Sequence, residues 1–194
     1  MSKVIVGAIQ HPKANNAITI ATGSTIYMPG ACVQIATVRS DNRVSYIAPN
    51  SGGGTTITDL NLTIAPRNAN SILQITWMIS GETSQDTNFL VHRNGSLILD
   101  SGYEGLNNQA GNTTLSSGYT TAWYDTDISS TPCTFYIRYC IPAGNTASRT
   151  YAPAVRSSEY NGNQIFYLNR PVGNLGSDNN ENGFSNGIIM EIGA

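Results

Sequence analysis

Charged residues are scarce in this sequence of 194 residues. Lysine and arginine together number 10, aspartate and glutamate 12, so charged residues make up 11% of the chain and its net charge at pH 7 is −2. The arginines are scattered, which excludes the basic cluster that a nucleic-acid-binding surface needs. Residues 1–50 contain four basic residues and one acidic residue (+3), whereas the remainder contains six basic and eleven acidic (−5). This asymmetry favours contact between the N-terminal segment and an acidic protein surface.

Cysteine and histidine are also rare. Cys32, Cys133 and Cys140 form no CxxC pair and show no zinc spacing, and their odd number predicts reduced thiols. In one extended strand, Cys133 and Cys140 would lie about 23 Å apart, too far for a disulfide. The two histidines, His11 and His92, are too few for a His-rich metal site, and no serine or cysteine stands in a nucleophile elbow or triad context. We therefore predict no metal, no cofactor and no enzymatic activity.

Long apolar runs are absent as well. The first residues, MSKVIVGAIQHPK, contain an apolar run of only six residues, from Val4 to Ile9. A secretory signal needs an apolar region of about 7–15 residues. No stretch approaches the roughly 18 apolar residues that indicate a transmembrane helix. We expect neither an export signal nor membrane insertion, and a chain that folds in a cytoplasm.

The residues that are abundant are those of turns and strands. Gly, Ser, Thr and Asn supply 79 of the 194 residues, while the helix formers Lys, Glu and Ala are scarce for this length. Apolar residues recur at every second position in several short segments, and no segment shows a convincing helical period. We predict an all-β protein, an antiparallel β-sandwich of jelly-roll-like topology.

Individual strands follow from this alternation. Apolar residues alternate in 60–64, in 73–79 and in 135–141, and shorter strands are expected at 165–168 and 187–193. Pro66 and the turn-like residues after it predict that the chain reverses or crosses to a second sheet between the first two strands. Ile57 is out of phase with Leu60, which indicates a bulge or a strand start near Asp59.

A hairpin is the strongest local prediction. FLVHRNGSLIL, residues 89–99, contains Asn94-Gly95, the dipeptide that a two-residue type I′ turn requires. In that hairpin Arg93 pairs with Ser96, His92 with Leu97 and Leu90 with Leu99. His92 is then interpreted as a structural residue.

The first fifty residues differ from the rest. They contain two short strands around a Gly-Ser turn but no wide apolar face, and Gly52-Gly53-Gly54 is typical of a linker. We therefore place a boundary near residue 50. Residues 1–50 are expected to form an N-terminal arm or short shaft-like segment that docks and contributes trimer contacts, and residues 51–194 the β-sandwich domain.

Two acidic motifs invite a chemical interpretation. Asp178 begins a segment that imitates the first half of a calcium loop, but Ile189 stands where the bidentate glutamate belongs, and an exposed Asn-rich loop is the alternative. Asp125 and Asp127 would share one face of an extended strand beside aromatic residues, as in a sugar-cleaving site, but a loop offers the same pattern. Neither motif changes the prediction of a protein without metal or catalysis.

Four aromatic residues lie in polar, glycine-rich segments: Tyr103, Tyr119, Trp123 and Tyr124. Exposed rings of this kind stack on sugars or fill subunit interfaces. Burial of Trp123 in the sandwich is the competing interpretation. The four residues are the sequence-based candidates for glycan or subunit contact.

The sequence also resembles a known family. The stretch GGGTTITDLNLTIAPRNANSILQITWMIS, the hairpin FLVHRNGSLIL, the strand TFYIRYCIP and the ending IIMEIGA are similar to the C-terminal β-domain of fibre-like virion proteins of tailed bacteriophages, of the kind found in phages of cyanobacteria and marine bacteria. IQHPKANNAITIATGSTIYMPGACVQ, residues 9–34, looks like the last piece of shaft before such a domain. The fifty residues that precede the β-domain here are too few for a long fibre, since fully extended they reach at most roughly 170 Å.

This resemblance implies a non-enzymatic virion protein. We expect a homotrimer on the outside of a phage particle, with partners such as the major capsid protein or a tail protein, in a capsid-decorating, cementing or short-fibre role. The N-terminal residues Lys3, Val4, Ile5, Val6 and Ile9 are the candidates for particle docking. The alternative is a tail fibre or receptor-binding protein that recognises a host surface glycan through the four aromatic residues named above. Glycan hydrolysis by Asp125 and Asp127 is the enzymatic alternative.

Overall fold

The computed structural model describes residues 29–83, 87–98, 120–122, 132–157, 162–173 and 181–193. These residues form two antiparallel sheets of six strands each, and they include no α-helix. The only helical element among them is a single 3-10 turn, η1 (Thr58–Leu60). The predicted all-β fold with two antiparallel sheets is confirmed.

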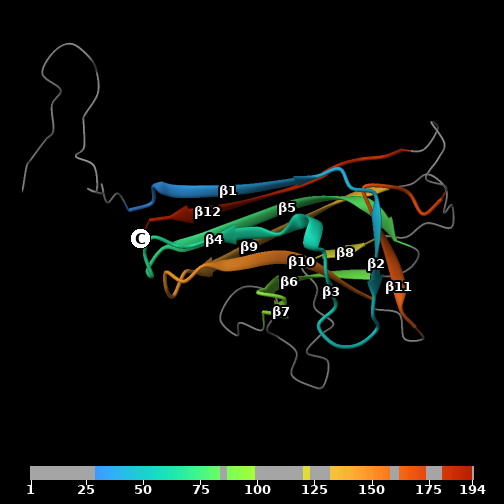
Figure 1. Ribbon diagram of the computed structural model, residues 1–194, viewed down its shortest axis with the longest axis horizontal. Coiled ribbons are helices and arrows are strands. Elements are labelled where there is room, and N and C mark those ends of the chain that lie inside the picture. Colours follow the sequence, from blue (N-terminus) through green and yellow to red (C-terminus); the bar gives the residue numbers. More distant parts are fainter. Residues whose placement is uncertain are drawn as a thin grey trace, which may run out of the picture.

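Sheet A is organised around one long strand, β5 (Ile72–Thr83). One edge of β5 pairs with β9 (Cys133–Pro142) along almost its whole length. The other edge pairs first with β12 (Ser185–Ile192) and then, from Gly81 onward, with β11 (Gln164–Leu168). β12 continues to β1 (Cys32–Ser40), and β11 continues to β2 (Val44–Ala48). The sheet is therefore forked, and Figure 1 shows β2 and β11 running across the direction of β1 at one end of the molecule.

Sheet B lies beneath β5 and is built on β10 (Arg149–Ser157) and β6 (Thr87–Arg93), which pair with each other. The other edge of β10 pairs with β3 (Thr55–Thr56) and with β4 (Leu62–Ile64). The far edge of β6 pairs with β7 (Ser96–Leu97) and with β8 (Thr120–Ala122). The chain leaves sheet B at Ile64 and enters sheet A at Ile72, so the predicted break at Pro66 is a crossing between sheets.

The core lies between the two sheets and follows the predicted alternation. Leu73, Ile75, Trp77 and Ile79 of β5 are all fully buried, and the indole Nε1 of Trp77 donates a hydrogen bond to the backbone oxygen of Leu60, 3.0 Å away. Three phenylalanine rings from different strands meet beside them. The centroid of Phe89 is 5.1 Å from that of Phe135 and 5.2 Å from that of Phe166, distances at which aromatic rings attract.

The predicted hairpin is confirmed where the structure describes it. Asn94 and Gly95 have φ angles of 53° and 77°, the left-handed values of a type I′ turn, and Arg93 pairs with Ser96 and His92 with Leu97. The predicted pairing of Leu90 with Leu99 falls outside the described residues. His92 is buried, with Nε2 donating to the backbone oxygen of Gly53 and Nδ1 accepting from the hydroxyl of Thr56, both at 2.7 Å. Its ring therefore ties the hairpin to neighbouring backbone.

Two strands of sheet A come from the segment that the sequence assigned to the arm. β1 and β2, residues 32–48, pair with β12 and β11, so the sandwich includes them and the boundary near residue 50 does not separate them from it. The glycines that imitate a linker have a different physical role. A Cβ atom on Gly54 (φ 84°) would lie 2.7 Å from the backbone oxygen of Val155, so this glycine permits close packing.

The connection from β3 to β4 contains η1 where the sequence predicted a bulge or strand start near Asp59. Ile57 and Leu60 are both fully buried because the 3-10 turn brings them onto one side, which explains their unequal spacing. Asp59 accepts hydrogen bonds from Asn42 Nδ2 at 2.5 Å, in the connection between β1 and β2, and from the hydroxyl of Tyr46 on β2. Burial raises the pKa of Tyr46, and the hydrogen bond to Asp59 raises it further.

Buried polar groups connect the two branches of sheet A by hydrogen bonds. Asn169, fully buried and with φ 59°, donates from Nδ2 to the backbone oxygens of Ser40 (3.0 Å) and Asn42 (2.9 Å). Its Oδ1 accepts from the Ser185 hydroxyl at 2.6 Å, and the Ser185 oxygen accepts from the backbone N–H of Ser80 at 2.9 Å. One side chain thus connects the turns at the ends of β1 and β11 with the start of β12.

A second buried polar contact fixes the other end of β12. Glu191 has no solvent exposure, and its carboxylate accepts hydrogen bonds from the backbone N–H groups of Arg67 (2.9 Å) and Asn68 (3.0 Å) and from Gln34 Nε2 (2.7 Å). Burial alone raises the pKa of the carboxyl, but these hydrogen bonds outweigh it, so the pKa of Glu191 lies below its ordinary value of 4.5. Glu191 therefore anchors the crossing segment between β4 and β5.

Glu191→Gln is expected to lower the free energy of unfolding at pH 7 by about 1–3 kcal/mol, because the backbone donors lose a charged acceptor. The folded-state pKa is lowered, so the stabilisation is complete above the unfolded-state pKa and is lost as the pH falls through the folded-state pKa. Urea unfolding at pH 7 and at lower pH should show the difference from the wild type shrinking below about pH 4.5. Glu181→Gln, at an exposed position, is the control. A difference that does not change with pH would contradict this account.

Candidate functional site

The most extensive feature that could serve function is the side of β1, β12, β9 and residues 72–78 of β5 that faces away from the core, which we call the outer face. The register places its side chains in rows across four strands. One row is Ile35, Met190, Gln74 and Cys140, and the next is Thr37, Ile188, Thr76 and Arg138. The other members are Arg39, Asn186, Met78 and Tyr136, and at the far end Ile192 and Ile72.

The outer face is rich in apolar side chains, although no other described element covers it. Tyr136 is 64% exposed and Ile35 57%, and they lie on the two outermost strands, β9 and β1. Met78, Ile188, Met190, Ile192 and Ile72 between them are partly exposed. Contiguous apolar patches of this kind on a soluble protein mark interaction surfaces.

The charges on the outer face are few and of one sign. Arg39 and Arg138 are its charged members, and no acidic residue lies on it among the described residues. Arg39 stacks on the ring of Phe184 at 4.7 Å, and the amide of Gln74 in its favourable orientation accepts from Arg138 at 2.9 Å. Depletion of charge at the centre with aromatic and arginine side chains around it is the composition of a protein interface.

The two strands that border the outer face have open edges. Within the part of the chain that the structure describes, β1 pairs only with β12, and β9 pairs only with β5. Their remaining backbone N–H and C=O groups offer an additional strand a place to pair. The apolar face and its two edges together form a surface that is suited to assembly.

The sequence-based site residues lie outside the described residues. This holds for the docking candidates Lys3, Val4, Ile5, Val6 and Ile9, for the aromatic candidates Tyr103, Tyr119, Trp123 and Tyr124, and for Asp125, Asp127 and Asp178. These assignments remain predictions.

The outer face was not identified residue by residue from the sequence, because Met78, Thr76 and Gln74 read as the polar phase of a half-buried strand. The available signal was GIIMEI, in which Ile188 and Met190 are apolar on the phase opposite to buried Ile189.

Within the described residues, no group of three or more His, Cys, Asp or Glu side chains is placed to hold a metal ion. Cys32, Cys133 and Cys140 are free thiols. No helix in the described part of the chain is long and apolar enough to span a membrane.

Comparison with known proteins gives a distant similarity in fold. No family model matches the sequence, and no curated protein matches it. A chain in the structure of the Gx strain of infectious bursal disease virus is similar with a TM-score of 0.40 and 14% identity, over 92% of this chain and 38% of that chain. A chain of the VP2 subviral particle of infectious bursal disease virus is similar with a TM-score of 0.30 and 14% identity, over 83% of this chain and 38% of that chain.

The similarity to these viral structures gives no family assignment. This chain spans 38% of the length of each of the two viral chains. Both TM-scores are below 0.5, so the comparison carries no argument about function. The outer face of sheet A therefore has to be interpreted from its own chemistry.

Proposed function

We propose that this protein is a non-enzymatic structural component of a bacteriophage particle, a homotrimer displayed on the particle exterior in a capsid-decorating or cementing role. Its N-terminal residues, including Lys3, Val4, Ile5, Val6 and Ile9, dock on the shell, where the positive charge of this segment suits an acidic protein surface. The sequence motifs similar to phage fibre-like proteins support the virion role.

The observation that carries the proposal is the outer face of sheet A. Burying it between copies removes exposed apolar side chains such as Ile35 and Tyr136 from water, and each buried Å² of apolar surface contributes about 25 cal/mol. Closed symmetry lets identical subunits bury such faces and sheet edges without forming open filaments. Because the face holds no acidic residue among those described, assembly through it pairs arginines with backbone and amide oxygens rather than with carboxylates.

Introducing a charge on the outer face is expected to dissociate the oligomer. Ile35→Asp and Tyr136→Asp place a carboxylate at the two sides of the face, and both positions are exposed in the single chain, so folding should be preserved. We expect light scattering coupled to size exclusion to give the mass of three copies for the wild type and of one copy for each variant. Ile47→Asp is the matched control, since Ile47 is 60% exposed and lies on β2, which is not one of the four strands of the outer face. A monomeric wild type, or equal dissociation in the Ile47→Asp variant, would refute assembly through this face.

The location on the particle is tested separately. Immunogold labelling of intact phage should place the chain on the shell rather than on the tail. Because β1 and β2 are part of sheet A, the docking variant should remove residues 1–28 and leave residues 29–194 intact. We expect that variant to keep its oligomeric state and to lose particle attachment. Labelling confined to the tail would overturn the decorating role.

A further inference from the structure

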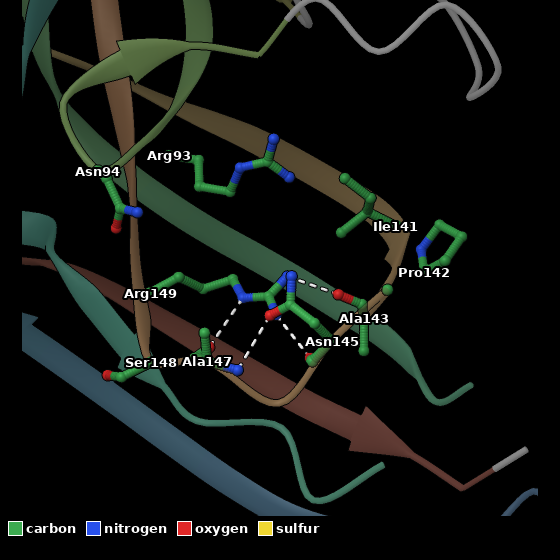
Figure 2. Close-up of a pocket in the computed structure, with 10 residues that line it drawn as sticks. Arg93, Asn94, Ile141, Pro142, Ala143, Asn145, Ala147, Ser148 and Arg149 are labelled. Atoms are coloured by element: carbon green, nitrogen blue, oxygen red, sulfur yellow. Dashed lines mark hydrogen bonds between the residues drawn. The ribbon is translucent and has the colours of Figure 1, made fainter. Parts of the chain in front are cut away.

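A pocket opens at the end of the molecule where the hairpin of β6 and β7 meets the connection from β9 to β10. Its volume is about 570 Å³, and residues 93–94 and residues 141–149 line it (Figure 2). The walls are held by backbone hydrogen bonds: Asn94 N–H donates to Thr150 O at 2.7 Å, and Gly144 N–H donates to Ala69 O at 2.8 Å. The pocket is therefore a preformed feature of the described fold.

The pocket is positively charged. Arg93 and Arg149 both line it, and no aspartate or glutamate is among its described lining residues. Arg149 is only 6% exposed, and its guanidinium donates to the backbone oxygens of Ala143, Asn145 and Ala147 and to Asn145 Oδ1, at 2.6–3.2 Å. These acceptors are neutral dipoles, so they orient the guanidinium without cancelling its charge.

The arginine and asparagine side chains of the pocket have donors left over. The Arg93 guanidinium has no hydrogen-bond or ion-pair partner among the described residues, and Arg149 uses four of its five N–H groups. Asn94 and Asn145 likewise have an occupied side-chain acceptor and a spare donor. The side-chain oxygen of Asn94 accepts from Thr150 N–H at 2.9 Å and that of Asn145 from Ala147 N–H at 2.9 Å, while their amide nitrogens have no partner among the described residues.

A pocket with positive charge, spare donors and occupied acceptors is complementary to a group that only accepts hydrogen bonds and carries negative charge. A carboxylate has this chemistry, and its two oxygens match the fork of an arginine guanidinium. Figure 2 shows Arg93 and Arg149 on opposite sides of the hollow, with Ile141 and Pro142 along a third side. Pro142 is exposed and can cover the C–H face of a ring that carries the carboxylate, whereas Ile141 is only 4% exposed and belongs to the core.

We propose that this pocket binds an acidic saccharide, with the sugar carboxylate held between Arg93 and Arg149 and the ring against Pro142. The volume lies within the roughly 300–1,000 Å³ of small-molecule sites, whereas a protein partner would need an area near 800 Å². β10 is paired along both edges, and β6 pairs with β10 on one side and with β7 on the other at Arg93, so neither of these two strands offers a peptide a free edge. The site is distinct from the four aromatic residues that the sequence offered for glycan contact.

The test uses the full chain and titrates it with glucuronic acid, its methyl ester and glucose, followed by calorimetry or by chemical shifts of the amides of residues 141–149. We expect glucuronic acid to bind at least about tenfold more tightly than the ester or glucose, since only the free acid carries the charge. Arg93→Gln should weaken binding of the acid about tenfold or more and should fold normally, because Arg93 has no partner to lose among the described residues. Arg43→Gln, the same change at an exposed arginine outside the pocket, should leave binding unchanged.

Three results would overturn the proposal. Equal affinities for the acid, the ester and glucose would remove the role of the carboxylate. Binding of acetate or inorganic phosphate as tight as that of glucuronic acid would show that the sugar ring is not recognised. Tighter binding of an Asp- and Glu-rich peptide would assign the pocket to a protein partner. Because oligomeric mass is unaffected by Arg93→Gln in this account, failure here is separable from failure of the proposed assembly.

Discussion

Replacing Gly81 with alanine is expected to destabilise the protein by about 3 kcal/mol or more. Gly81 lies where β5 changes partners, opposite Leu168 of β11 and Cys133 of β9. A Cβ atom there would overlap the backbone oxygen of Tyr167 and would lie 2.7 Å from Cζ of the buried Phe166 ring. A backbone oxygen in a paired strand cannot move aside as a flexible side chain can, so the alanine must separate β5 from β11.

Urea unfolding at pH 7 measures this effect. Gly162→Ala is the control, because a Cβ atom at Gly162 meets no heavy atom within 4 Å and its φ angle is ordinary; we expect a change within about 0.5 kcal/mol. If the alanine at position 81 cost less than about 1 kcal/mol, the close approach of β5 and β11 described above would be wrong.

Asn169→Ala is expected to cost a similar amount, about 3–5 kcal/mol. The alanine removes three buried hydrogen bonds and leaves the backbone oxygens of Ser40 and Asn42 without their side-chain donor, each loss costing roughly 1–3 kcal/mol. It also has to adopt a φ angle of 59°, which costs an L-residue with a Cβ atom about 1–2 kcal/mol.

Two glycine variants separate these contributions. Asn169→Gly keeps the left-handed backbone and loses only the hydrogen bonds, so it should be destabilised less than Asn169→Ala, by the backbone contribution. Asn94→Gly is the matched control at the other asparagine with a positive φ angle, where the side chain is exposed and accepts one hydrogen bond from Thr150. We expect this control to cost less than about 1 kcal/mol in thermal or urea unfolding. Equal losses at the two positions would contradict a special role for Asn169 at the fork.

The strands were predictable because a strand that buries one face has apolar residues at every second position of its sequence. Leu73, Ile75, Trp77 and Ile79 alternate with exposed or partly exposed residues, and the hairpin at Asn94-Gly95 depends only on local backbone geometry. The pairing of strands was not predictable, because β1 and β12 are separated by most of the chain and no local pattern specifies partners. The boundary near residue 50 illustrates the same limit. Gly54 reads as a linker in the sequence, although it packs against Val155.

The surfaces that we interpret as functional were less accessible to sequence reasoning. Tyr136 and Ile35 belong to one face only because two strands, β12 and β5, lie between β9 and β1. Arg93 and Arg149 are unremarkable as single residues, and they become a paired feature when the hairpin and the connection after β9 meet. The residues that the sequence did single out, such as Trp123 and Tyr124, fall outside the described residues and keep the standing of predictions.

The order of strands in sheet A has a consequence for biosynthesis. β12, from the C-terminal part of the chain, lies between β1 and β5, and β11 lies between β2 and the end of β5. During synthesis, β1 therefore cannot pair with β12 until the intervening residues have been translated. At about 5–20 residues per second, this takes on the order of ten seconds. During that delay β1 lacks the only strand with which it pairs among the described residues, so sheet A closes late in folding.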